Sequence, residues 1–366
     1  MITKRKIGTR KSRLALWQAN YAKKKIETLG IECEIIKIKS EGDVNQITPL
    51  YDFGVSGIFT KSLDQALLNN TIDIAVHSYK DVPVNLAANL SIHCVFKRAS
   101  SKDIVVLKSK NIDFKKNLTI ATSSIRRKTQ WLNKYPHHKI VSLRGNVESR
   151  IKKLEKNDWD GAIFAKAGLD RLSISLENKM ILDWMIPSAA QGAVAITSRS
   201  NEKELNNLLR SISCNSTFHC VSQEREFLKL MNGGCSVPIS AFAKIENNKL
   251  YFKASVSSLD SKNIATVEDT FDSSDLEAGK KIFRKILKNG GEKILRELKK
   301  ENEKKDTEMY KGALQECQLW KDCLSIGMTY PSWRKRHFTK KEDKESVRKL
   351  MKAYEEVELY LQNKLK

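Results

Sequence analysis

A carboxylate and an amine stand side by side directly after a short, mostly apolar run. The segment His77-Ser-Tyr-Lys80-Asp81-Val-Pro83 follows the run at residues 72–76. Polar side chains that follow a strand of a parallel sheet lie at the edge where ligands bind. A carboxylate such as Asp81 can there exchange a proton or stabilise a cation. A solvated turn before a proline is the alternative that spacing alone leaves open.

Arginines occupy comparable positions elsewhere in the chain. Thr122-Ser-Ser124-Ile-Arg126-Arg127 joins a predicted strand to a predicted helix, whose free N–H groups and dipole favour an anion. A guanidinium group suits a carboxylate because it makes paired hydrogen bonds, each worth about 1.5 to 3 kcal/mol. Further polar residues that also follow predicted strands or begin helices are Arg10, Ser12, Arg144 and Arg150. This pattern predicts an anion-binding cleft, although a lysine-rich protein also carries solvated arginines.

One cysteine lies in a glycine-rich loop, Asn232-Gly-Gly-Cys235-Ser-Val-Pro238. A diglycine after a helix is an ordinary C-terminal cap, and a lone cysteine is usually a small buried apolar residue. The functional alternative is an exposed thiol whose glycine neighbours let a bulky group approach. A basic cleft would favour its thiolate form, which is the nucleophile.

The elements that must position these residues alternate between strands and helices. Strands are predicted at 6–9, 33–39, 72–77, 118–122, 140–143 and 161–165, and helices at 12–29, 60–68, 123–135 and 147–156. This alternation predicts an α/β fold with mainly parallel sheets, in which ligands bind at the carboxyl ends of the strands. The two halves of the pattern share an outline, a weak internal duplication that predicts two lobes around a cleft.

The pattern changes after Thr217 to a smaller α+β domain, and an amphipathic helical tail follows it. The predicted domains are a first lobe with the catalytic carboxylate (1–96 and 196–216), an arginine-rich second lobe (97–195), a third domain with the cysteine (217–305) and a helical extension of unknown role (306–366).

Composition excludes several classes of protein. The chain has 366 residues, 40% of them hydrophobic and 30% charged, which is typical of a globular protein and not of a collagen-like or disordered chain. No apolar run approaches the ~18 residues of a membrane span, and the first ten residues lack the apolar core of a signal peptide. We therefore expect a cytoplasmic protein without membrane association. The seven cysteines form no C-x-x-C pair, so neither a disulfide framework nor a metal site is expected.

The net charge of +23 implies an anionic partner or serves solubility. Nucleic acid is the first candidate. The lysines are spread along the whole chain, however, and no recognition motif or aromatic stacking platform accompanies them. We therefore expect no specific nucleic-acid partner.

Taken together, these segments make the chain resemble the hydroxymethylbilane synthase (porphobilinogen deaminase) family of tetrapyrrole biosynthesis, from about Ile7 to about Lys300. The resemblance rests on eight segments in order: Gly8-Thr-Arg10-Lys-Ser12-Arg-Leu-Ala-Leu-Trp-Gln18, Phe59-Thr-Lys61, Asp73-Ile-Ala-Val-His-Ser-Tyr-Lys80-Asp81-Val-Pro83, Thr122-Ser-Ser-Ile-Arg126-Arg127, Leu143-Arg-Gly-Asn146, Ala167-Gly-Leu-Asp-Arg-Leu172, Gln191-Gly-Ala193 and Gly233-Gly-Cys235-Ser-Val-Pro238. Each segment alone is weak evidence, but their order and separation are highly specific.

The resemblance implies two lobes built like bilobal solute-binding proteins and a third domain that carries a dipyrromethane cofactor on Cys235 through a thioether. It implies a transferase that joins four porphobilinogen molecules head to tail with loss of ammonia, and then releases hydroxymethylbilane by hydrolysis. Because each porphobilinogen carries an acetate and a propionate, the growing chain needs many arginines in one cleft. The cations formed during condensation need a carboxylate, which the resemblance places at Asp81.

The resemblance also assigns the site residue by residue. The implied catalytic residues are Asp81, Lys80 and Arg10. The implied cofactor-binding residues are Cys235, Ser12, Lys80, Asp81, Ser124, Arg126, Arg127, Arg144 and Gly145. The implied substrate-binding residues are Arg10, Ser78, Arg144, Arg150, Lys61 and Gln191. No metal is implied, and we expect a monomer whose partner is porphobilinogen.

Some residues depart from the family pattern. Ser56 stands where the family usually has a lysine, Ala190 where a glycine commonly precedes Gln191-Gly192, and Tyr79 where an aliphatic residue is usual. Because one carboxylate must serve successive additions, we expect hinges near residues 97–101 and 191–217 and a mobile loop at 43–56.

Two other classes of function compete with this enzyme. Two α/β lobes around a basic cleft also suit a non-catalytic binding protein for small anions, against which stand the missing export signal and the Gly-Gly context of Cys235. A nucleic-acid-binding protein would use the positive charge, but has no motif in its favour.

Overall fold

The computed structural model describes residues 4–40, 60–233, 237–325 and 344–365. The chain divides into two compact units, residues 1–295 and 296–366. In the described ranges no helix combines the length and apolar character needed to cross a membrane.

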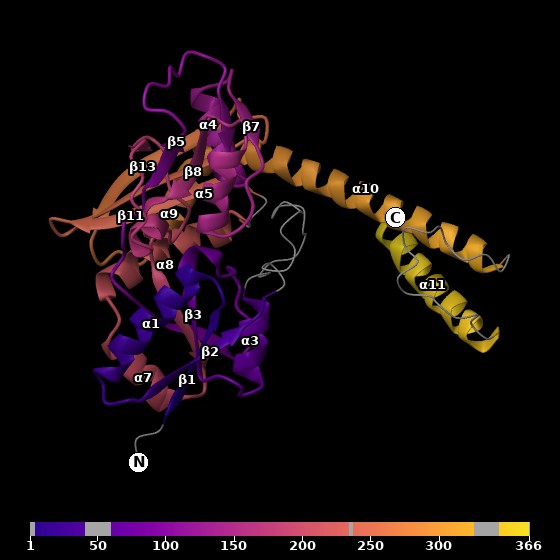
Figure 1. The fold of residues 1–366 in the computed structure, drawn as a ribbon, viewed down its shortest axis with the longest axis horizontal. Coiled ribbons are helices and arrows are strands. Elements are labelled where there is room, and N and C mark those ends of the chain that lie inside the picture. Colours follow the sequence, from indigo (N-terminus) through magenta and orange to yellow (C-terminus); the bar gives the residue numbers. More distant parts are fainter. Residues whose placement is uncertain (1–3, 41–59, 234–236, 326–343, 366) are drawn as a thin grey trace. The chain divides into compact units, whose positions relative to one another are not determined.

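The first lobe is built on a five-stranded sheet with the strand order β2-β1-β3-β10-β4 (Figure 1). β1 pairs in parallel with β2 and β3, whereas β10 is antiparallel to β3 and β4. Its strands are β1 (Arg5–Arg10), β2 (Cys33–Ile38), β3 (Ile74–Ser78), β4 (Leu90–Val95) and β10 (Val194–Arg199), and its helices are α1 (Arg13–Glu27), α3 (Lys61–Leu68) and α7 (Lys203–Ser211). Since β1 and β3 run the same way, their carboxyl ends meet at one edge of the sheet.

The second lobe repeats this plan in a sheet of order β7-β6-β8-β5-β9. β6 pairs in parallel with β7 and β8, and β5 is antiparallel to β8 and β9. Its elements are β5 (Asp103–Leu107), β6 (Thr119–Ala121), α4 (Ile125–Lys134), β7 (Lys139–Val141), α5 (Val147–Lys156), β8 (Gly161–Ala165), α6 (Lys166–Arg171) and β9 (Lys179–Ile181). The expected two-lobed α/β fold is confirmed. Each sheet is mixed, because it contains one antiparallel strand: β10 in the first lobe and β5 in the second. Each of these strands directly follows a crossover between the lobes.

Helix α1 shows why these residues form this element. Ser12 caps its first turn by accepting a hydrogen bond from the Ala15 N–H at 3.3 Å. Ala19, Ala22 and Ile26 recur at helical spacing and are buried on the face that packs against the sheet. Full burial of Ile26 alone stabilises the fold by roughly 1.5 to 3 kcal/mol.

The third domain contains an antiparallel sheet, β11-β12-β13, whose first strand packs on the long helix α8. Its elements are α8 (Asn215–Leu230), β11 (Ile239–Glu246), β12 (Lys249–Ser257), β13 (Ile264–Asp272), α9 (Ala278–Ile286) and a π-helical segment (Leu287–Gly291). Helix α10 (Glu292–Ser325) follows and continues into the second unit, which also holds α11 (Lys344–Leu365). The predicted helical character of the tail is thus confirmed for its described part.

A single buried carboxylate, Glu224 of α8, joins both crossovers to the third domain. It accepts hydrogen bonds from Arg98 Nη1 at 2.5 Å, from the Ala190 N–H at 2.6 Å and from the Ala243 N–H at 2.6 Å. Arg98 lies in the crossover between β4 and β5, Ala190 in the one between β9 and β10, and Ala243 in β11. One expected hinge segment, 97–101, and the residue that directly precedes the other therefore meet α8 at Glu224.

Replacing Gly192 by alanine should destabilise the fold by more than the usual strain of a left-handed residue. Gly192 has φ +88, and an added Cβ would lie 2.7 Å from the carbonyl oxygens of Ala99 and Ser100. The positive φ costs about 1 to 3 kcal/mol for a non-glycine residue, and the clash with backbone atoms adds to this. Urea unfolding of the variant measures the loss of free energy.

Gly30→Ala is the matched control, because Gly30 has φ +77 but nothing within 4 Å of an added Cβ. If both variants lost the same free energy of unfolding, the close contact between the two crossovers at Gly192 would make no contribution to the cost of the substitution.

Candidate active site

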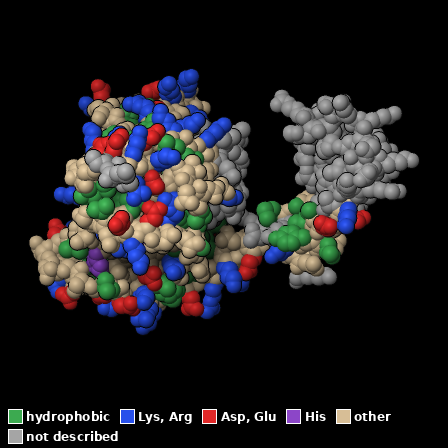
Figure 2. Space-filling model, turned by 90° about the horizontal axis from the view of Figure 1, so that it is seen from below, with side chains coloured by type: hydrophobic (Ala, Val, Ile, Leu, Met, Phe, Trp, Pro, Cys, Tyr) green, Lys and Arg blue, Asp and Glu red, His purple; other side chains and the backbone are tan. Residues whose placement is uncertain are grey.

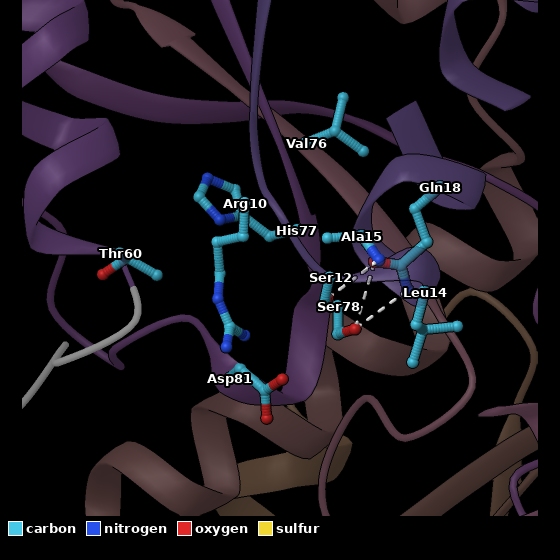
Figure 3. A pocket seen from close by; sticks show the side chains of 10 residues that line it. All are labelled: Arg10, Ser12, Leu14, Ala15, Gln18, Thr60, Val76, His77, Ser78 and Asp81. Carbon is cyan, nitrogen blue, oxygen red and sulfur yellow. Dashed lines mark hydrogen bonds between the residues drawn. The ribbon is translucent and has the colours of Figure 1, made fainter. Parts of the chain in front are cut away.

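The predicted carboxylate Asp81 ends a 3-10 turn, Tyr79–Asp81, that directly follows β3. Its side chain is exposed, and no described residue donates a hydrogen bond to it. Figure 3 shows the Arg10 side chain extending from the end of β1 toward this carboxylate. The residues that line the pocket around them are Arg10, Ser12, Leu14, Ala15, Gln18, Thr60, Val76, His77, Ser78 and Asp81. The ends of β1 and β3 thus bring together four predicted site residues: Arg10, Ser12, Ser78 and Asp81.

Helix α1 also fixes one wall of this pocket. Gln18 Nε2 donates to Ser78 Oγ at 2.8 Å, and Ser78 Oγ lies 3.2 Å from Gln18 Oε1. His77 is buried beside them, and burial together with the charge of Arg10 lowers its pKa to about 4. His77 is therefore neutral near pH 7, so it adds no charge to the pocket.

Lys80 is half-buried next to Asp81. Its Nζ donates to Gln191 Oε1 at 3.3 Å. Burial lowers the pKa of Lys80 to about 8, although the charge of Asp81 opposes the shift. This amine therefore exchanges its proton more readily near neutral pH than an ordinary lysine does.

Arg126 and Arg127 converge on a carboxylate that the sequence analysis missed. Asp103 is fully buried at the start of β5. It accepts hydrogen bonds from Arg126 Nη1 at 2.8 Å and from Arg127 Nη2 and Nε at 2.7 and 3.0 Å. The two guanidinium groups hold the pKa of Asp103 well below its usual range despite its burial. The sequence signal was an aspartate at the head of an apolar run, a position where a buried charge requires partners.

Gln191 connects this cluster to Lys80. Its Nε2 donates to Asp103 Oδ1 at 3.0 Å and to the Ser101 carbonyl at 2.7 Å, while its Oε1 accepts from Lys80. The side chain of Gln191 is fully buried. Its amide is engaged within the protein, so the implied direct contact with substrate has no support from this geometry.

The remaining predicted arginines lie on the loop and helix after β7. Arg144 is buried, and Arg150 Nε donates to the Gly145 carbonyl at 2.7 Å. The pKa of Arg150 is lowered to about 10, first by burial and then by the positive charges of Arg127 and Arg144. Asp81 and Arg10 also act on Arg150, which means that groups from both lobes share one electrostatic environment.

Two predicted residues, Ser124 and Lys61, are placed differently. Ser124 caps α4 and lines a second pocket with Thr122 and Lys128. Lys61 is exposed at the start of α3, and no hydrogen bond or ion pair to another described residue brings it to the group. Cys235 lies outside the described residues, as do Ser56 and the loop at 43–56.

On the face seen in Figure 2, positive charge is spread widely and does not gather in one patch. Figure 2 shows Lys and Arg side chains distributed over one face with Asp and Glu side chains between them. Several lysines pair with carboxylates, such as Lys249 with Asp272 at 3.0 Å and Lys253 with Glu268 at 2.8 Å. Exposed pairs of this kind contribute at most about 1 kcal/mol each.

Two α/β lobes that share a cluster of arginines, a lysine and an exposed carboxylate define a class of enzyme that acts on an anionic small molecule. Residues 6–207 match the family model described as "Porphobilinogen deaminase, dipyromethane cofactor binding domain", and residues 218–288 match "Porphobilinogen deaminase, C-terminal domain". The chain belongs to the porphobilinogen deaminase family, whose members are transferases.

Curated relatives agree with this assignment. The porphobilinogen deaminase of Geotalea uraniireducens is 38% identical over 299 residues, which cover 80% of this chain and 94% of the relative. Those of Syntrophomonas wolfei and Chlorobium luteolum are 37% and 36% identical, with 81% and 80% of this chain covered and 99% and 97% of theirs.

Proposed function

We propose that this chain is a hydroxymethylbilane synthase, which condenses four porphobilinogen molecules onto a dipyrromethane linked to Cys235 and releases the product by hydrolysis. In each addition the C–N bond of the substrate breaks and ammonia leaves with the electron pair. A C–C bond then forms to the terminal ring, whose reacting carbon loses a proton. The observation that carries the proposal is the exposed Asp81 carboxylate, toward which Arg10 extends and whose charge also acts on Arg150 of the second lobe, in a chain of this family.

The donor set of the site fits a dipyrromethane. Guanidinium groups at Arg10, Arg144 and Arg150 suit its acidic side arms, and the Asp81 carboxylate suits its pyrrole N–H groups. A dipyrromethane bound there would supply the ring carbon to which each new pyrrole is joined. The thiol of Cys235 would hold it through a thioether.

The residues of the chain then divide the chemistry between them. Asp81 stabilises the positive charge that develops when the substrate loses ammonia and when the ring carbon is attacked. Lys80 holds a proton beside it, and Gln191 orients that amine. Arg126 and Arg127 contribute positive charge at fixed positions, because the Asp103 carboxylate holds both guanidinium groups in place.

Intact-protein mass spectrometry tests the proposed anchor. The chain purified from a host that makes tetrapyrroles should carry an adduct of two condensed pyrrole units and should turn coloured with an acidic aldehyde reagent. Cys235→Ser should abolish both signals, because its hydroxyl does not form the thioether.

Cys214→Ser is the matched control, because Cys214 is a partly exposed free thiol at the start of α8. An unmodified mass for the folded wild-type chain, or an adduct that disappears from Cys214→Ser instead, would refute the assignment of Cys235.

A further inference from the structure

Arg225 of α8 is a buried cation that contacts the turn carrying Asp81. Its Nη1 donates to the carbonyls of Val82 at 3.1 Å and Tyr79 at 3.4 Å, and its Nη2 donates to the carbonyl of Pro83 at 2.5 Å. Its guanidinium carbon also lies 4.5 Å from the centre of the Tyr79 ring. The side chain therefore binds both ends of the turn.

This arrangement is electrostatically expensive. In the described part of the chain no carboxylate forms an ion pair with Arg225, and only 9% of the residue is exposed. Burial accordingly lowers the pKa of Arg225. Carbonyl dipoles and an aromatic ring compensate a buried cation less fully than a carboxylate does. A neutral side chain would fill this space at a lower electrostatic cost. The buried charge of Arg225 is therefore better explained by the backbone carbonyls that it binds than by a contribution to stability.

The side chains of Tyr79 and Val82 are buried in an apolar cluster that includes Val221 of α8, but the backbone of the turn has few hydrogen bonds of its own. Its backbone is held by the bond from the Tyr79 N–H to the Ala193 carbonyl at 3.0 Å and by the bond from the Val82 N–H to the Tyr79 carbonyl at 3.2 Å. No described residue donates to the Asp81 carboxylate, so the position of the backbone decides where that carboxylate lies. Arg225 adds three contacts to this backbone from a different domain.

Helix α8 also leads into the loop that contains Cys235. It ends at Leu230, and the Gly233 N–H donates to the Leu228 carbonyl at 2.9 Å, which fixes the start of the loop on the helix. A helix rises about 1.5 Å per residue and is stiff over this length. The same rigid element therefore holds the catalytic turn through Arg225 and begins the cofactor loop two residues before Cys235.

We propose that Arg225 is a positioning residue that sets the place of the Asp81 carboxylate, by holding the carbonyls of residues 79, 82 and 83 on α8. This inference rests on the proposed function and extends it, because it assigns to the third domain a role in aligning the carboxylate of the first lobe.

Steady-state kinetics of Arg225→Met and Arg225→Lys test this role, on protein whose adduct has been verified by mass spectrometry. A misplacement of about 1 Å costs roughly 10²-fold in rate, so we expect kcat of Arg225→Met to fall by about 10- to 100-fold. KM should stay within about threefold, because other arginines bind the substrate carboxylates. Arg225→Lys, which keeps the charge but loses the fork of donors, should be intermediate.

Lys229→Met is the matched control, since Lys229 is exposed one turn further along α8 and should leave kcat and KM unchanged. Wild-type kcat in both Arg225 variants would overturn the inference. If Arg225→Met does not fold, the same comparison is made with Arg225→Lys, and an unchanged kcat there overturns it equally.

Hydrogen exchange provides a readout that needs no turnover. The amides of Tyr79 and Val82 should exchange faster in the folded Arg225 variant than in the wild type, while those of β3 stay protected. Uniformly faster exchange throughout the first lobe would show that Arg225 stabilises the whole lobe and does not specifically position the turn. If the wild type carried no adduct and no activity, the proposed function would fail, whereas the exchange result would still decide whether Arg225 holds the turn.

Discussion

Asp81→Asn should lower the turnover of porphobilinogen, per adduct-bearing chain, by about 10² to 10⁴-fold, because a neutral amide removes the charge that stabilises the cations of the reaction and the group that could accept a proton. The fold should survive. Asp81 is exposed and accepts no hydrogen bond from the described residues, so the free energy of unfolding should change by no more than about 0.5 kcal/mol.

Ammonia release and product formation measure the rate, and thermal unfolding checks the fold. Asp81→Glu is the informative companion, because it keeps the charge and moves it by one methylene. We expect its rate to lie between those of the wild type and Asp81→Asn. A near-normal rate in Asp81→Asn would exclude this carboxylate from the chemistry.

Asp103→Asn should have the largest effect on stability, a loss of about 3 to 5 kcal/mol at pH 7, because the variant leaves two buried guanidinium groups without their carboxylate. Asp170→Asn is the matched control in the same lobe. Its carboxylate pairs with Lys166 at 2.7 Å on the exposed face of a helix, and its loss should cost about 0.5 kcal/mol or less. Urea unfolding compares the two.

The contribution of the Asp103 carboxylate to the free energy of unfolding should decrease in acid. Because the folded-state pKa of this aspartate is lowered, its contribution is fully present above the unfolded-state pKa of about 3.9. The contribution is lost as the pH falls through the folded-state pKa, which lies lower. The difference in unfolding free energy between wild type and Asp103→Asn should therefore be constant near neutrality and shrink in acid. A difference that is absent at pH 7 would show that the two arginines need no counter-charge.

Much of the fold follows from local patterns. The caps at Ser12 and Ser124 and the apolar runs of β3 and β8 each determine an element from a few neighbouring residues, and the structure has these elements close to where the patterns place them. Strand pairing is different, because β10 enters the first sheet more than a hundred residues after β3. No periodicity within one segment indicates such a partner.

The same limit explains which parts of the site were missed. Arg126 and Arg127 stand at a strand end, as an anion clamp would, but their principal partner is Asp103, more than twenty residues earlier in the chain. Residue types and spacing identify charged groups near a cleft, whereas they do not show which charges neutralise each other. The roles of Gln191 and Arg225 likewise depend on contacts between segments 88 and 146 residues apart.

The ion pair between Arg98 and Glu224 limits how the chain can be divided into fragments or combined with parts of homologues. A fragment that stopped before α8 would retain the Arg98 guanidinium without its counter-ion, and an isolated C-terminal piece would retain the Glu224 carboxylate with the Ala243 N–H but without Arg98 and the Ala190 N–H. Either product would carry an uncompensated charge into its interior. We therefore expect modular exchange of these parts between homologues to succeed only when Arg98 and Glu224 are transferred as a pair.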